Sequence, residues 1–248
     1  MRNMFITLLV LALVHGLAAQ SPSRLDDPVH GDFRIDNPRF LNSCRVGTAV
    51  DQIARSAGVL VGFENTPDCP ASPRSRSRTA QTGDEVLTGL TARAALDRLI
   101  ALAPAYRWKE MDGVAVVRPI AAWDDPANVL NRPVAAFTVA NAHPHEALHV
   151  LLQSALPSLF APHTDERLSG NGRRDGSTAP AEIDAPVSVA FRGGTLLAAL
   201  NALANAHQRA MWQFGYISGS ALIELQALDN LGSATLIHTA PIVAASTR

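Results

Sequence analysis

Apolar residues recur at helical spacing in two segments of the chain, "TARAALDRLIALAPAYRW" (Thr91 to Trp108) and "TLLAALNALANAHQRAMW" (Thr195 to Trp212). Each segment opens on a threonine that can cap a helix, and leucines three positions apart then form a stripe on one helical face. Alternating apolar and polar positions follow, and the turns "MDG" and "ISGS" lead into a second alternating run. Both segments therefore predict a helix followed by a β-hairpin.

The two segments align without a gap, which indicates an internal duplication. The alignment superposes identical residues in both copies: Gly89 on Gly193, Leu96 on Leu200, and Trp108 on Trp212. An earlier helical pattern also repeats, because "GTAVDQIARSAGVLVGF" matches "HEALHVLLQSALPSLFA". The expected fold class is α+β, with two tandem small two-layer modules. Each module is expected to hold a small sheet and two helices, in the order strand-helix-strand, then strand-helix-strand-strand.

The duplication sets the expected boundaries. The first module is expected over residues 30–120, the second over 133–228, with a linker at 121–132 and a C-terminal tail at 229–248. Each module contains a long polar segment, "TPDCPASPRSRSRTAQTGDE" in the first and "HTDERLSGNGRRDGSTAPAEID" in the second. Both segments are rich in Pro, Ser, Gly and Arg, so they are expected to be surface loops.

Residues 1–19 have the pattern of a secretory signal peptide. Arg2 precedes an apolar run from residue 5 to residue 14, and small residues follow at Ala18 and Ala19. The run is short for a bilayer span, and the mature chain is expected to contain no transmembrane segment. The expected location is periplasmic or secreted.

An exported chain changes the interpretation of its two cysteines, Cys44 and Cys69. An isolated pair in an oxidising compartment usually closes on itself, so a Cys44–Cys69 disulfide is expected. Closing that loop would stabilise the fold by roughly 3 to 4 kcal/mol on the chain-entropy model. A reactive thiol and half of a metal site remain the alternatives, although the spacing lacks the CxxC form that either favours.

The composition selects no charged partner. The 248 residues carry a formal net charge of -1, and their basic residues are arginines apart from Lys109. Because the arginines are scattered or lie in polar loops, no nucleic-acid partner is expected. Apolar residues make up 47% of the chain and aromatic residues 5%, which suits modest cores built from Ala, Leu and Val.

The sequence also lacks common catalytic and cofactor motifs, including the GxSxG elbow, the P-loop and the dinucleotide glycine pattern. His145 and His149 lie four positions apart with Glu146 nearby, but surface or cap histidines are favoured over zinc ligands because no third ligand is evident. Solvated positions are expected for the lone carboxylates Glu64, Asp84, Asp97 and Glu110. The expectation is therefore no catalytic residue, no cofactor and no metal.

The segments "AVDQIARSAGVLVGFE" and "LTGLTARAALDRLIALAPAYRWKEMDGVAVVRP" together resemble the short domain at the N-terminus of secretins and of signalling TonB-dependent receptors. The second copy, "AFRGGTLLAALNALANAHQRAMWQFGY", resembles it more weakly. The chain departs from the family where "GTGL" is expected after the second helix, since "LAPA" and "NAHQ" stand there instead. The resemblance implies small two-layer modules that bind other proteins.

The sequence therefore predicts an exported, non-catalytic protein-binding protein of the cell envelope. The resemblance implies a partner of the secretin, outer-membrane receptor or sigma-regulator type. The alternative is a small-molecule or glycan binder that uses the groove between the modules, and a hydrolase comes third. The helices are expected to cover one face of each sheet, which leaves the outer face and the strand edges free for a partner strand.

Overall fold

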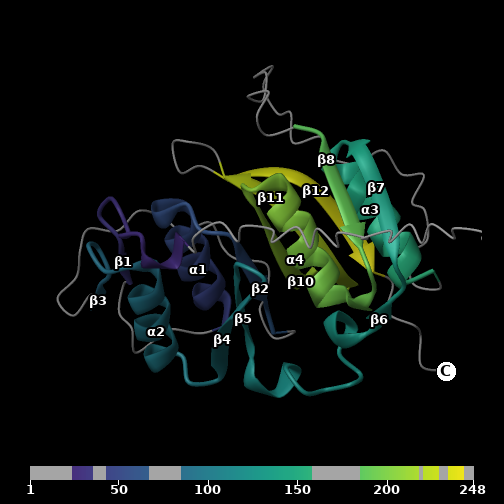
Figure 1. The fold of residues 1–248 in the computed structure, drawn as a ribbon. Coiled ribbons are helices and arrows are strands. Elements are labelled where there is room, and N and C mark those ends of the chain that lie inside the picture. Colours follow the sequence, from purple (N-terminus) through teal and green to yellow (C-terminus); the bar gives the residue numbers. More distant parts are fainter. Residues whose placement is uncertain are drawn as a thin grey trace, which may run out of the picture.

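The computed structural model of the chain describes residues 24–35, 43–66, 85–157, 185–217, 220–228 and 234–242. These residues contain four α-helices and several small sheets, arranged as two units of the same order (Figure 1). Each unit begins with a strand and a helix, and each ends with a helix and a hairpin. The predicted α+β fold class is confirmed.

The elements of the two units follow one another along the chain. In the first they are η1 Arg24–Asp26, β1 Arg34–Ile35, α1 Ser43–Ala57, β2 Val61–Glu64, β3 Glu85–Val86, α2 Ala92–Leu102, β4 Tyr106–Met111 and β5 Val114–Pro119. Those that follow are η3 Ile120–Ala122, η4 Val129–Asn131, β6 Pro133–Val134, β7 Phe137–Ala142, α3 Pro144–Ala155, β8 Val187–Phe191, β9 Gly194–Thr195, α4 Leu196–His207, β10 Ala210–Ile217, β11 Ser220–Leu228 and β12 Ala234–Ile242.

Local chemistry fixes the corresponding helix starts in both units. The side chain of Thr91 accepts a hydrogen bond from the backbone N–H of Ala94 at 3.2 Å, at the start of α2. Thr195 caps α4 in the same way by accepting from Ala198 at 3.2 Å. Each threonine satisfies a helix N–H that has no partner within the helix, as the sequence predicts.

One six-stranded sheet runs through both units, in the order β12-β11-β10-β2-β5-β4. Strand β2 of the first unit pairs in parallel with β5 on one side and with β10 of the second unit on the other. The pairs β1-β3, β6-β9 and β7-β8 form separate small sheets. The two modules that the sequence predicts are thus joined by backbone hydrogen bonds rather than only by a linker.

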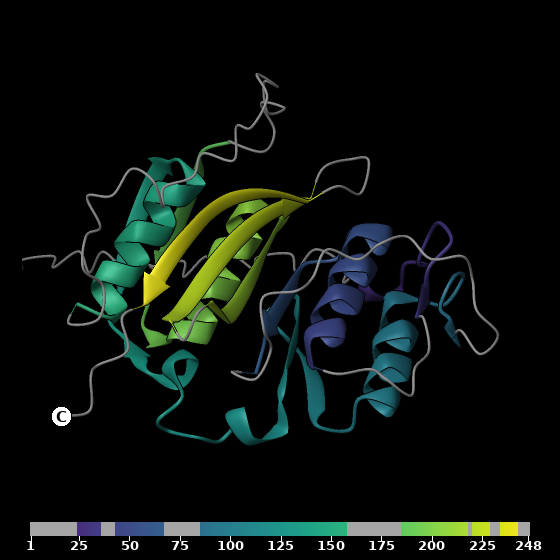
Figure 2. The same ribbon diagram turned by 180° about the vertical axis from the view of Figure 1, so that it is seen from behind.

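The helices of the two units cover opposite faces of this sheet. Ala115 and Val117 of β5 belong to the core around α1 and α2. The alternate residues Val114 and Val116 belong to the core around α3 and α4. Helix α4 lies in front of β10 and β11 in Figure 1 and behind them in Figure 2. The expectation of a free outer face is therefore wrong for the first unit, because β5 is buried on both sides.

Two segments outside the expected modules take part in the fold. Residues 121–132, expected as a linker, include η4, where Leu130 is fully buried in the core of the second unit. Part of the expected tail, Ala234–Ile242, forms β12 and pairs antiparallel with β11. Strand β12 takes the place beside β11 that β2 takes beside β5, so both hairpins have a third strand.

Several sequence predictions lie outside the described residues. These are the signal peptide at 1–19 and Asp84, together with most of both polar loops. The disulfide prediction also lies there, because neither Cys69 nor the side chain of Cys44 is described. Across the ranges that the structure does cover, none of the helices combines the length and the apolar character that crossing a bilayer requires.

Candidate functional site

Strand β4 forms one end of the six-stranded sheet, and it pairs only with β5 among the described strands. Its hairpin turn is built from Asp112 and Gly113, which both have positive φ (53° and 77°). A two-residue turn of this kind fixes the register, with Met111 opposite Val114. The strand therefore presents a defined outer edge.

The register decides which backbone groups of β4 point outward. The N–H of Ile120 donates to the C=O of Ala105 at 2.9 Å, so hydrogen-bonded pairs with β5 recur at every second residue from that point. The N–H and C=O groups of Trp108 and Glu110 fall between these pairs and face away from β5. In the described part of the chain, no other strand bonds to them. This row of backbone groups can accept a further strand.

The side chains of Trp108 and Glu110 lie on the α2 side of β4. The indole N–H of Trp108 donates to the Asp97 carboxylate at 2.8 Å. Arg93 lies over the Trp108 ring at 5.7 Å and forms ion pairs with Glu110 at 3.1 Å and Asp26 at 3.2 Å. Asp97 and Glu110, which the sequence predicted as lone solvated carboxylates, are exposed but have partners.

The other side of β4 is organised around Trp123, which follows β5. Lys109 and Arg107 of β4 lie over the Trp123 ring at 4.6 and 5.2 Å, and Arg118 of β5 lies over it at 5.3 Å. Cation–π contacts of this kind orient long basic side chains while leaving their charge available. The positive groups of β4 are therefore held in place beside the free edge.

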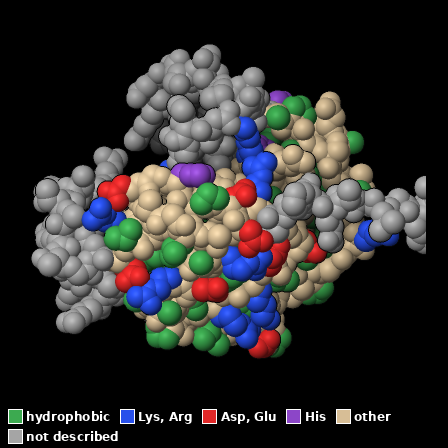
Figure 3. All heavy atoms as spheres, turned by 60° about the vertical axis from the view of Figure 1, so that its left-hand side comes forward, with side chains coloured by type: hydrophobic (Ala, Val, Ile, Leu, Met, Phe, Trp, Pro, Cys, Tyr) green, Lys and Arg blue, Asp and Glu red, His purple; other side chains and the backbone are tan. Residues whose placement is uncertain are grey.

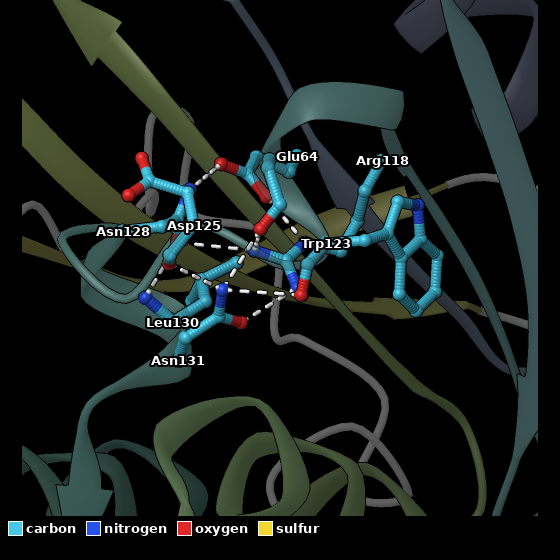
Figure 4. Close-up of polar contacts among 8 residues, drawn as sticks. Glu64, Arg118, Trp123, Asp125, Asn128, Leu130 and Asn131 are labelled. Carbon is cyan, nitrogen blue, oxygen red and sulfur yellow. Dashed lines mark hydrogen bonds and ion pairs between the residues drawn. The ribbon is translucent and has the colours of Figure 1, made fainter.

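Arg118 is itself fixed by a buried ion pair with Glu64 of β2 (Figure 4). Glu64 is 3% exposed and Arg118 is fully buried. The prediction of a solvated Glu64 is wrong, because β2 lies in the middle of the sheet and its residue 64 faces the loop that follows β5. A buried pair of opposite charges is tolerated only when its remaining hydrogen-bonding groups have partners.

Those partners come from the segment that the sequence predicted as a linker. Arg118 donates to the side-chain oxygens of Asn131 at 2.9 Å and Asn128 at 3.0 Å, and to the C=O of Ala122 at 3.0 Å. The amide of Asn128 donates to the second oxygen of Glu64 at 2.5 Å. The network fastens residues 122–131 over the sheet, and this places Trp123 beside β4.

The second unit contains the counterpart of the β4 edge. The indole N–H of Trp212 in β10 donates to the side-chain oxygen of Asn201 at 2.9 Å, and Asn201 stands eleven positions before it. Trp108 and Asp97 have the same separation and the same hydrogen bond. In β10 this edge is occupied, because Trp212 pairs with Gly62 of β2. The edge of β10 is thus paired with β2 of the same chain, whereas no described strand pairs with the equivalent edge of β4.

On the face of the molecule that Figure 3 shows, acidic and basic side chains of the described residues lie close together. One exposed pair joins Arg98 of α2 to Glu85 of β3 at 2.5 Å. The hydrogen bond from Arg98 lowers the pKa of Glu85. Exposed pairs of this kind add little stability individually.

The histidines considered as zinc ligands lie at the start of α3. His145 and His149 are in this helix, and the His145 ring stacks on that of His143 at 5.8 Å. Glu146 accepts a hydrogen bond from the backbone N–H of His143 at 3.1 Å, so its carboxylate caps the helix. Among the residues that the structure describes, no three His, Cys, Asp or Glu side chains lie together as metal ligands would.

Comparisons with protein-family models, with curated proteins and with solved structures find no match for this chain. The candidate site is therefore defined only by the contacts of β4 described above. The repeat in the sequence points to Trp108, whereas no motif or repeat points to Arg118, Trp123 and the two asparagines. Their only sequence signal was a tryptophan and two amides in a short polar segment, which does not reveal a buried ion pair.

Proposed function

We propose that this chain is an exported, non-catalytic protein-binding protein of the cell envelope, which binds its partner by adding a strand to the edge of β4. The observation that carries the proposal is the pair of outward-facing backbone groups at Trp108 and Glu110, at the end of a six-stranded sheet. Strand addition draws its affinity from main-chain hydrogen bonds, so it needs no catalytic constellation.

The surroundings of β4 suit a docking edge. Its backbone is held by β5, and its side chains are held by α2 on one side and by Trp123 on the other. A rigid edge loses little conformational freedom when a partner strand pairs with it. Arg107, Lys109 and Glu110 place charges along the strand, and charges on an edge oppose indiscriminate pairing. The edge is therefore suited to a specific partner.

The location and the class of partner rest on the sequence. The pattern of residues 1–19 supports export, and the resemblance to secretin and TonB-receptor modules supports a partner of the secretin, outer-membrane receptor or sigma-regulator type. The alternative, a small-molecule or glycan binder using the groove between the units, gains no support from the described junction. There, β2 and β10 are hydrogen-bonded directly and Trp212 is fully buried against Gly62.

A proline placed on the outer edge tests the proposal. The N–H of residue 110 points away from β5, so Glu110→Pro removes an outward donor and leaves the β4-β5 hydrogen bonds in place. Glu110→Ala is the matched control, because it loses the same contact with Arg93 but keeps the N–H. The immobilised variants are incubated with an envelope extract of the source organism. Partner capture should survive in Glu110→Ala and disappear in Glu110→Pro, with both variants folded by circular dichroism.

A second variant separates the edge from the polar loops. Deleting residues 72–83 and 165–180 removes the Arg-rich parts of both loops while keeping Cys69. Capture of the same partner should stay within a few fold of the full chain. If the deletion abolishes capture, or if Glu110→Pro captures as well as Glu110→Ala, binding by the β4 edge is the wrong mechanism.

A further inference from the structure

We propose that the segment bound at β4 runs parallel to it, with a glycine beside Trp108 and an acidic residue on each side of that glycine. This inference rests on the proposed function and defines the chemistry of the partner. Its basis is the junction between β10 and β2, where the chain has already filled the corresponding edge.

The internal junction shows what the edge accepts. The backbone groups of Trp212 face β2, which runs parallel to β10 and places Gly62 opposite Trp212. A Cβ at position 62 would lie 2.1 Å from Cζ2 of Trp212 and 2.2 Å from its Cε2. The indole therefore covers the neighbouring strand, and only glycine leaves room for it.

The β4 edge repeats this geometry. Trp108 is held by Asp97 as Trp212 is held by Asn201, through the same indole nitrogen and across the same eleven positions. From this correspondence we infer that the Trp108 ring extends over the position that an added strand would occupy, as the Trp212 ring extends over Gly62. A side chain at that position of the added strand would then collide with the ring.

The charges of β4 distinguish its partner from β2. At the positions of Met211 and Gln213 in β10, strand β4 carries Arg107 and Lys109. Met211 packs in the core that contains Val61 and Phe63, the residues on either side of Gly62. In an added strand, the equivalent residues would lie beside two positive groups held on Trp123. Acidic side chains are the complement of that pair.

The same charges argue against a second copy of this chain as the occupant. An antiparallel pair of β4 strands centred on Trp108 places Arg107 of one copy opposite Lys109 of the other. Like charges directly opposite each other destabilise a strand pair. A foreign acidic segment is therefore favoured over self-association.

The test uses a synthetic peptide, acetyl-Thr-Val-Thr-Glu-Gly-Glu-Thr-Val-Thr-amide, and the folded chain. Binding is measured by calorimetry against two control peptides, one with Glu-Val-Glu and one with Lys-Gly-Lys at the centre. Each control should bind at least about tenfold more weakly, since one collides with Trp108 and the other repels Arg107 and Lys109. Binding should be lost in Glu110→Pro, and Glu110→Ala, which loses the same side chain but keeps the N–H, should bind at least about tenfold more tightly than Glu110→Pro.

Lys109 gives an independent readout, because it is the only lysine in the chain. A carbodiimide activates a carboxylate, and an amine then displaces the urea to form an amide without a spacer, so coupling favours groups that already lie in contact. The acetylated peptide has no amine, and peptide mapping distinguishes coupling at Lys109 from coupling at the α-amine of the chain. Coupling should join Lys109 to a peptide glutamate, and Lys109→Gln should remove the product.

The inference is overturned if the Val peptide binds as well as the Gly peptide, if the Lys peptide binds as well as the Glu peptide, or if coupling is independent of Lys109. Failure of all peptides, while envelope-partner capture still depends on the Glu110→Pro change, overturns the inference and leaves the proposed function standing. If neither the peptides nor the envelope partner responds to Glu110→Pro, both proposals fall.

Discussion

The indole ring of Trp212 lies over Gly62 and fills the space that a side chain at position 62 would need. Trp212 belongs to the second unit and Gly62 to the first, so this contact joins the two halves of the sheet. Trp212 is fully buried there, and Asn201 of α4 binds its indole N–H. Asn201 also donates to the C=O of Met111 at 3.4 Å, so one amide links both hairpins.

Replacing Gly62 should therefore weaken the whole fold. Gly62→Ala forces a methyl group into the Trp212 ring, and overpacking of this kind should lower the free energy of unfolding by about 2 to 3 kcal/mol. Urea denaturation followed by tryptophan fluorescence measures the change. Gly215→Ala is the control, since a Cβ there would lie 3.8 Å from the Cβ of Asn65, an ordinary contact. Equal stability of the two variants would contradict the packing described here.

The buried ion pair gives a second prediction. Glu64→Ala leaves the Arg118 guanidinium buried without its counter-charge, which should cost about 3 to 5 kcal/mol of stability. The double variant Glu64→Leu, Arg118→Met should recover much of this loss, because no unpaired charge remains. The measurement is again the free energy of unfolding in urea.

An exposed pair supplies the comparison for that experiment. Asp51 and Arg55 of α1 form an i,i+4 ion pair at 2.5 Å with partly exposed side chains. Asp51→Ala should cost only about 0.3 to 0.5 kcal/mol. A Glu64→Ala loss as small as that of Asp51→Ala would mean that the network in Figure 4 does not hold the loop on the sheet.

The carboxylate of Glu224 gives a prediction about pH. Glu224 is partly buried on β11, and this burial raises its pKa although Gln226 donates a hydrogen bond to it. A raised pKa in the folded state means that folding is favoured while the group is protonated, and that this advantage is lost as the pH rises through the folded pKa. Glu224→Gln should therefore raise the melting temperature at pH 7, and the gain should vanish near pH 4 and below, around the ordinary glutamate pKa of about 4.3.

Glu85 should show the opposite sign. Its pKa is lowered by the hydrogen bond from Arg98, so its contribution to stability is present at neutral pH and lost as the pH falls. Glu85→Gln should lower the melting temperature slightly at pH 7 and have no effect in acid. If both variants change the melting temperature equally at every pH, the pKa values of Glu85 and Glu224 are not shifted in opposite directions, and the prediction is wrong.

Asp97 and Asn201 occupy equivalent positions in the two units, and replacing each by the residue of the other should have very different costs. Asn201 is fully buried, whereas Asp97 is exposed, although each accepts the indole N–H of its own tryptophan. Asn201→Asp would bury a carboxylate and bring it toward the C=O of Met111, which should cost more than about 3 kcal/mol. Asp97→Asn keeps the acceptor at the surface and should change stability by less than about 0.5 kcal/mol. Similar losses in both variants, measured in urea, would contradict this difference in burial.

The parts of the fold that were predictable from sequence depend on local chemistry. The threonine caps, the leucine stripes and the hairpin after each helix follow from residues close together in the chain, and the repeat doubled the signal. The repeat predicts that Trp108 and Trp212 are equivalent, and each donates its indole N–H to a residue eleven positions earlier. These features need no knowledge of which strands pair across the molecule.

The features that were missed depend on pairing between distant strands. The sequence predicts a solvated Glu64 because nothing near it in the chain indicates its partner Arg118, which lies 54 positions later. The sequence predicts a free outer face for the first unit because its pattern does not show that α4 packs against β5. The sequence predicts a tail where β12 forms. Residues 234–242 become a strand because they pair with the edge of β11, and the local pattern does not show that this edge is open.

The most direct test of the β4 edge is hydrogen exchange of single backbone amides, measured by NMR in the free chain and in its complex with the captured partner. The amides of Arg107 and Lys109 face β5 and should exchange slowly in both states. Those of Trp108 and Glu110 should exchange quickly in the free chain and become protected in the complex. Protection elsewhere in the chain, with Trp108 and Glu110 unchanged, would contradict the account.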